Sequence, residues 1–76
     1  MSSFSKAMRQ IMVEKGMRQV DVVNASGESK SYVHNVLTGY IKSVPFNRAC
    51  NLIDALGVTL EEFRAIELTF EESEDA

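Results

Sequence analysis

The chain has few of the residues from which disulfide frameworks, metal centres and membrane segments are built. Its 76 residues include one cysteine, one histidine, one proline and no tryptophan. A single cysteine, Cys50, excludes an internal disulfide, and one cysteine with one histidine is too few for a structural zinc site. No apolar run approaches the roughly 18 residues that a membrane-spanning helix needs. We therefore expect no metal, no cofactor and no membrane segment.

The same scarcity argues against an enzyme. One histidine and one cysteine cannot supply a nucleophile, a base and an orienting group at one site. The first ten residues, MSSFSKAMRQ, lack the apolar block of a secretory signal, so we expect a cytoplasmic protein. With 45% hydrophobic and 25% charged residues, the chain has the composition of one globular domain.

Charge is unevenly distributed along the chain. The net charge is −3, which by itself disfavours a nucleic-acid-binding protein, because phosphate contacts need Lys and Arg. Residues 1–48, however, carry seven basic and three acidic side chains, whereas residues 49–76 carry one basic and eight acidic side chains. The first part therefore has a net charge of +4 and the second of −7. An asymmetry of this kind is compatible with an oriented electrostatic surface, or with solvated helix faces that differ in sign.

Apolar residues recur at helical spacing in segments that end at glycine. This pattern predicts helices over residues 4–15, 19–26, 29–38, 45–56 and from 59 onward. Ser2 or Ser3 can cap the first helix, Ser29 the third, and Thr59 with Glu62 has the form of a capping box. We expect an all-α fold, a compact five-helix domain over residues 1–66, followed by an acidic extension over residues 67–76.

The segment after Arg64 is ambiguous. Its apolar residues Ile66 and Phe70 keep helical spacing with Phe63, but Ile66, Leu68 and Phe70 also alternate with polar residues as a strand would. A strand here would have no partner within its own helical fold and would have to pair with a second subunit. We favour a continued helix, because no helix-breaking residue interrupts the sequence.

Residues 16–39 have the layout of a DNA-reading helix-turn-helix. Two short predicted helices are joined by the turn Ser26-Gly27-Glu28, and the second helix buries Val33, Val36 and Leu37 on one side. Its other side is polar and consists of Lys30, Ser31, His34 and Asn35. Such a unit hides one side of each helix in the core and leaves the polar side free to enter a major groove.

Two stretches of the chain resemble the Cro and phage-repressor type of helix-turn-helix. The first comprises Gly16, Gln19, Val22, Val23, Gly27, Ser29, Ser31, Val33, Val36 and Gly39, and the second is the run from Leu52 to Phe63. Together they cover roughly residues 6–64, and the combination is more specific than either stretch alone. The resemblance implies a bundle of five helices in which the third reads bases.

The resemblance also implies a role for individual side chains. Lys30, Ser31, His34 and Asn35 would contact base edges, and Arg18, Gln19, Thr38, Tyr40, Lys42 and Ser43 would contact phosphates. The chemistry is suitable, since lysine donates to guanine, asparagine pairs with adenine, and serine can do either. His34 could equally be a solvated side chain, and Tyr32 could stack on a sugar or cover Val36.

Some residues depart from the family pattern. Glu28 stands where a small apolar residue is common, which would place a carboxylate near the DNA backbone and lower affinity. Val23 stands where alanine is usual, so the two helices would pack slightly further apart. These departures bear on DNA affinity more than on the fold.

From these patterns we expect a transcriptional regulator, a repressor, that binds a double-stranded DNA operator as a homodimer. The expected dimer surface is apolar and C-terminal, formed by Leu60, Phe63, Ile66, Leu68 and Phe70. The alternative is a protein-binding module, such as an antitoxin or antirepressor, that keeps the fold but uses its acidic C-terminal half to bind a protein partner.

Overall fold

All five expected helices are present in the computed structural model, which describes the backbone of residues 2–75 and the side chains of residues 2–71. They are α1 (Ser3–Lys15), α2 (Gln19–Ser26), α3 (Lys30–Thr38), α4 (Phe46–Leu56) and α5 (Leu60–Asp75). Over this part of the chain there is no strand. The prediction of a small all-α domain is confirmed.

Helices α1, α3 and α5 begin where the sequence places capping side chains. The Ser2 Oγ accepts a hydrogen bond from the Ser5 N–H at 3.2 Å, and the Ser29 Oγ accepts one from the Tyr32 N–H at 3.1 Å. At the start of α5, the Thr59 Oγ1 accepts from the Glu62 N–H at 3.1 Å while the Glu62 carboxylate accepts from the Thr59 N–H at 3.2 Å. These bonds satisfy N–H groups that have no partner within a helix.

The turn between α2 and α3 depends on a glycine. Gly27 has a φ of 74°, in the left-handed region, and its N–H donates to the Val23 carbonyl at 3.1 Å. A residue with a Cβ is strained in this conformation. The chain can therefore leave α2 and turn at once into the Ser29 cap of α3, which fixes the angle between the two helices.

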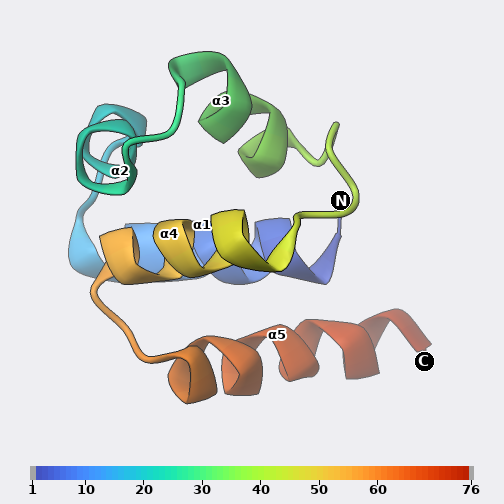
Figure 1. Ribbon diagram of the computed structural model, residues 1–76. Coiled ribbons are helices and arrows are strands. Elements are labelled where there is room, and N and C mark those ends of the chain that lie inside the picture. Colours follow the sequence, from blue (N-terminus) through green and yellow to red (C-terminus); the bar gives the residue numbers. More distant parts are fainter. Residues whose placement is uncertain (1, 76) are drawn as a thin grey trace.

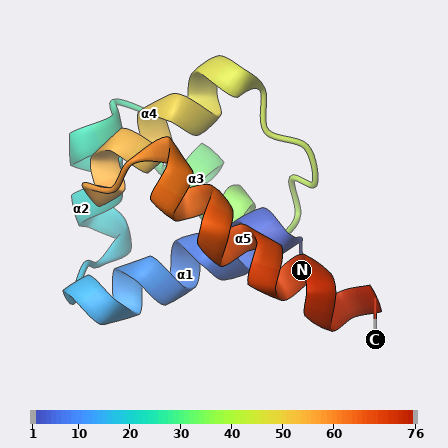
Figure 2. The ribbon, with the colours of Figure 1, turned by 90° about the horizontal axis from the view of Figure 1, so that it is seen from below.

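The helices form three levels in the view of Figure 1. Helices α1 and α4 lie in the middle, α3 lies above them, α5 lies below them, and α2 closes one end. Helix α5 packs on α1, which it crosses in Figure 2, and on α4, whereas α3 packs on α1 and α2. Within residues 2–75, α3 and α5 do not contact each other. The polar third helix and the acidic fifth helix are thus on opposite sides of the core.

The core lies between these levels and draws on every helix. Its most deeply buried side chains, each no more than 2% exposed, are Ala7, Met8, Ile11, Val22, Val33, Val36, Leu52, Leu56 and Phe63. Val23, expected inside, is half-buried at the edge of this cluster. The buried Ser5 Oγ donates to the Val36 carbonyl at 2.5 Å and ties α1 to α3.

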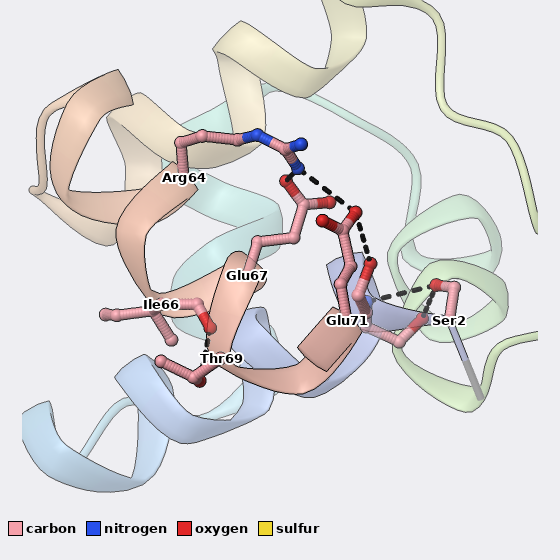
Figure 3. Close-up of polar contacts among 8 residues, drawn as sticks. Ser2, Arg64, Ile66, Glu67, Thr69 and Glu71 are labelled. Carbon is pink, nitrogen blue, oxygen red and sulfur yellow. Dashed lines mark hydrogen bonds and ion pairs between the residues drawn. The ribbon is translucent and has the colours of Figure 1, made fainter. Parts of the chain in front are cut away.

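Residues 65–71 are helical, so the strand alternative is wrong for this segment. Helix α5 continues without interruption across residues 66 and 67, where the expected domain ends and the expected acidic extension begins. Figure 3 shows Arg64 donating to Glu67 and Glu71, at 2.7 and 3.2 Å, and Glu71 also accepts from the Ser3 hydroxyl at 3.4 Å. The bonds to Glu67 and Glu71 raise the pKa of the Arg64 guanidinium. The bond between Ser3 and Glu71 connects α5 to the start of α1. The acidic side chains beyond Glu71 lie outside the described residues.

Candidate nucleic-acid interface

The four side chains expected to contact bases lie together on the outer side of α3. Lys30, Ser31 and His34 are exposed and Asn35 is half-buried. With Gln19 of α2 they line one open depression of about 280 Å³. The opposite side of α3 is buried through Val33, Val36 and Leu37. The helix therefore presents amine, hydroxyl, imidazole and amide groups on one surface, which is the donor and acceptor set that base edges in a major groove require.

Gln19 connects the two helices of the motif. Its Oε1 lies 3.5 Å from the His34 Nδ1, at the long limit of a hydrogen bond. With the proton on Nδ1, His34 donates to Gln19 and keeps Nε2 directed to other partners. Gln19, the first residue of α2, thus restrains the exposed side chain of His34 on α3.

The residues expected to contact phosphate do not form one group. Arg18 is beside Gln19 at the start of α2, where its side chain is 79% exposed. Thr38 and Tyr40 are at the other end of α3, and Tyr40 is 80% exposed. Lys42 and Ser43 are exposed and line a separate cavity of about 330 Å³ that extends to Arg64 of α5. Thr38, Tyr40, Lys42 and Ser43 are thus at and after the C-terminal end of α3, whereas Arg18 is at the start of α2.

The segment after α3 is held by the last turn of that helix. The Ile41 N–H donates to the Asn35 carbonyl at 3.1 Å, and the Thr38 Oγ1 donates to the same carbonyl at 3.3 Å. At the same end, the Arg9 Nε of α1 donates to the Leu37 carbonyl at 2.7 Å. A guanidinium here satisfies a terminal carbonyl and interacts favourably with the helix dipole. The sequence analysis missed Arg9 because its partner is 28 positions away.

Asp21 is paired with the exposed Arg18. The Arg18 N–H donates to the Asp21 Oδ2 at 2.8 Å, and the guanidinium lies 3.6 Å from Oδ1. The backbone bond, helped by the charge of Arg18, lowers the pKa of the Asp21 carboxyl. Asp21 is thus ionised and neutralises part of the positive charge at the start of α2.

Glu28 is placed differently from the expectation that it would face the DNA backbone. Its side chain is only 13% exposed and is directed to α4, where Oε1 lies 4.0 Å from the Arg48 Nε and Oε2 accepts from the Asn51 amide at 3.4 Å. The Arg48 guanidinium in turn covers the Tyr32 ring, 4.4 Å from its centroid. Glu28 is thus within ion-pairing distance of Arg48, which offsets part of its charge, and the expected loss of DNA affinity stays a prediction.

Arg48 is a residue that sequence reasoning did not identify. It contacts both the turn residue Glu28 and the α3 residue Tyr32, so it restrains the position of α3 relative to α4. Its guanidinium covers one face of the Tyr32 ring. A DNA sugar, suggested above as a stacking partner of Tyr32, therefore cannot use that face. No sequence spacing links Arg48 to residues 16 and 20 positions earlier, so only the fold reveals this cluster.

The five residues expected at a dimer surface divide into two groups. Leu60 and Leu68 are 50% and 41% exposed. Ile66 and Phe70 are half-buried against the core, and Phe63 is 2% exposed, with its ring centroid 4.8 Å from that of Phe4. Phe63 is therefore a core residue, and this burial corrects the expectation that it contacts a second chain. The apolar surface that remains on α5 is smaller than the sequence suggests.

None of the known family models, curated proteins or solved structures matches this chain. Across the described residues, no helix combines the length and apolar character needed to cross a membrane. The resemblance to the Cro and phage-repressor type of helix-turn-helix consequently stays a prediction from the residues, and the five-helix arrangement is what the structure itself establishes.

Proposed function

We propose that this protein is a sequence-specific, double-stranded DNA-binding transcriptional regulator of the cytoplasm, a repressor of the Cro and phage-repressor type, that reads an operator with α3. In this role no chemical step is catalysed. The protein would act by occupying the operator.

One observation carries the proposal. The outer side of α3 is polar and uncovered, and it forms a single depression with Gln19 of the preceding helix. In a helix-turn-helix, the second helix enters the major groove and its first residues contact base edges. Lys30 and Ser31 are the first two residues of α3, and His34 and Asn35 are one turn further along. Each good contact would discriminate against a wrong base by about 1–3 kcal/mol.

The local charge favours DNA although the net charge of the chain does not. Between residues 16 and 48 the acidic side chains are Asp21 and Glu28, and each is paired with an arginine. Lys30 and Lys42 are exposed, and no carboxylate of the described residues lies within ion-pairing distance of either. Lys30 at the start of α3 and Lys42 after its end are therefore uncompensated cations, which attract phosphate.

A homodimer is part of the proposal, because one helix-turn-helix unit covers few base pairs. Two copies related by a twofold axis would read half-sites one helical turn apart, about 34 Å. Leu60 and Leu68, two turns apart along α5, are its exposed leucines and the best candidates to contact the second copy.

In vitro selection from random duplex DNA tests this function. We expect enrichment of an inverted repeat whose half-sites are about one helical turn apart. The matched variants are Lys30→Ala and Val13→Ala, since Val13 is 81% exposed on α1, away from the depression. Val13→Ala should enrich the same sequence, whereas Lys30→Ala should lose preference at one or two positions. If the wild-type protein enriches no sequence, the proposal is wrong.

A second candidate function is a protein-binding module that uses α5. It is favoured by Glu61, an exposed carboxylate beside the exposed Leu60 in the first turn of α5, the helix that lies on the opposite side of the core from α3. An acidic surface with an apolar residue suits a basic protein partner better than it suits DNA. This candidate predicts no enriched DNA sequence and a partner that Glu61→Lys releases, a variant that leaves the Thr59–Glu62 capping box intact.

A further inference from the structure

A small apolar cavity adjoins the polar depression of α3. It has a volume of about 160 Å³ and is lined by Val20, Val23, Gln19 and Lys30. Gln19 and Lys30 also line the polar depression, so the two lie side by side and share these two side chains as a wall. Val20 is 48% exposed although it is a branched apolar residue in the second position of α2. The cavity therefore exposes apolar surface within the area that the proposed function assigns to base contacts.

The major groove contains one apolar group that such a cavity can accept. Each thymine carries a C5-methyl group on its major-groove edge, and proteins recognise it by apolar contact. The polar groups of the remaining bases are read by donors and acceptors, which Lys30, Ser31 and Asn35 supply. The two Val side chains offer no hydrogen bond, so a methyl group is the base substituent that they match.

We propose that the cavity between α2 and α3 binds the C5-methyl group of a thymine, and that Val20 is a specificity-determining residue of the operator contact. The thymine is adjacent to the base that Lys30 contacts, because Lys30 borders both the cavity and the depression. The inference depends on the proposed function and adds to it a base preference that the polar residues do not provide.

Replacement of thymine by uracil tests this proposal, since it removes only the methyl group. The probe is the duplex enriched by selection, with uracil substituted at each thymine in turn, and the measurement is the dissociation constant by fluorescence anisotropy. The position that Lys30→Ala relaxes identifies the base that Lys30 contacts. At the thymine next to it, uracil should weaken binding about fourfold, the contribution of one buried methyl group.

The variant Val20→Ala removes the exposed wall of the cavity. The difference between the thymine and uracil duplexes should then fall below about twofold. Binding of the uracil duplex should stay as in the wild-type protein, which also shows that the variant is folded. In the matched control Val13→Ala the fourfold difference should persist. Helix formation tolerates alanine at both positions.

The outcomes separate this inference from the function on which it depends. An operator that is bound tightly but equally well with uracil at every position would overturn the methyl contact and leave DNA reading intact. A methyl effect that Val20→Ala does not reduce would overturn the role of Val20. Failure of the selection to enrich any duplex would contradict both the proposed function and this contact.

Discussion

The α2–α3 pair and α5 are both amphipathic, yet they use their outer surfaces differently. The pair carries the exposed Lys30 and two paired carboxylates, Asp21 and Glu28, near an open polar depression, whereas α5 carries an excess of acidic side chains on the opposite side of the core. The Cα trace measures 36 × 22 × 22 Å, so opposite sides are further apart than the Debye length of about 8 Å at physiological salt. The net charge of this chain therefore describes neither surface.

The two regions also differ in how they are anchored. Helix α3 is fixed at its ends by polar contacts, from Arg9 at one end and through Glu28 and Arg48 at the other. Helix α5 is fixed near its start by the buried Phe63 and further along by the polar contacts of Arg64 and Glu71. Substitution of the buried Phe63 should therefore affect folding strongly, whereas substitutions on the outer side of α3 should affect binding with little change in stability.

The largest effect is expected for Phe63→Ala. Loss of a side chain that is 2% exposed leaves a cavity beside Phe4 and should cost about 3–5 kcal/mol of unfolding free energy. A domain of this length has roughly 4–11 kcal/mol in total, so the variant would lose a large share of its stability. Urea denaturation followed by circular dichroism measures this. The control Leu68→Ala, 41% exposed, should change the stability of the monomer by less than about 0.5 kcal/mol. Equal effects of the two variants would contradict the placement of Phe63 in the core.

A smaller effect, on binding rather than folding, is expected for Lys30→Ala. Affinity for the selected duplex should fall by about 1–3 kcal/mol, mostly through loss of preference at one base pair. Lys42→Ala is the matched lysine variant, and it should weaken all duplexes alike and reduce the salt slope by about one unit. Titrations of specific and random duplexes at several salt concentrations distinguish the two. A uniform loss from Lys30→Ala would remove its assigned role in base reading.

The contact between the turn and α4 can be examined with Glu28→Gln. The variant keeps the shape of the side chain but removes the ion pair with Arg48, which should lower stability by about 0.2–1 kcal/mol. Because the carboxylate is already paired, its removal should tighten DNA binding by less than about threefold at low salt. Denaturation and duplex titration measure the two effects. A tenfold gain in affinity with unchanged stability would instead indicate that the Glu28 carboxylate faces DNA and is not paired with Arg48.

The smallest effect concerns pH and Asp21. Its pKa in the folded protein is below the ordinary value of 3.8, so its stabilising contribution is present above that value and is lost as the pH falls through the folded-state pKa. Asp21→Asn should therefore weaken the dependence of folding stability on pH in the acid range. The sequence specificity of DNA binding at pH 7 should be unchanged. Thermal unfolding between pH 2 and pH 6, roughly the range in which carboxyl groups titrate, is the appropriate measurement. An unchanged acid profile would mean that Asp21 does not contribute.

Much of the fold follows from local patterns. The apolar spacing places Val33, Val36 and Leu37 inside, and the caps at Ser29 and Thr59 mark helix starts, because these features act within a few residues. The continuation of α5 also agrees with the local pattern. The burial of Phe63 does not, since an isolated helix pattern cannot tell whether an aromatic residue meets its own core or a second chain.

The candidate site was only partly predictable. The polar side of α3 follows from the same periodicity that identifies its buried side, so Lys30 and Asn35 could be named from the sequence. The contacts of Arg48 and Arg9 could not, because Glu28 and Leu37 are 20 and 28 positions away and are reached only when α4 packs on α2 and α1 packs on α3. The apolar cavity at Val20 likewise forms only when α2 and α3 meet.

A backbone amide NMR titration with the selected duplex tests the central claim most directly, because it locates the bound surface. Chemical-shift changes should concentrate on residues 18–20 and 29–43, with the outer side of α5 unchanged once the protein is dimeric. Changes confined to α5, with the amides of Lys30 to Thr38 unaffected, would contradict the assignment of DNA reading to α3.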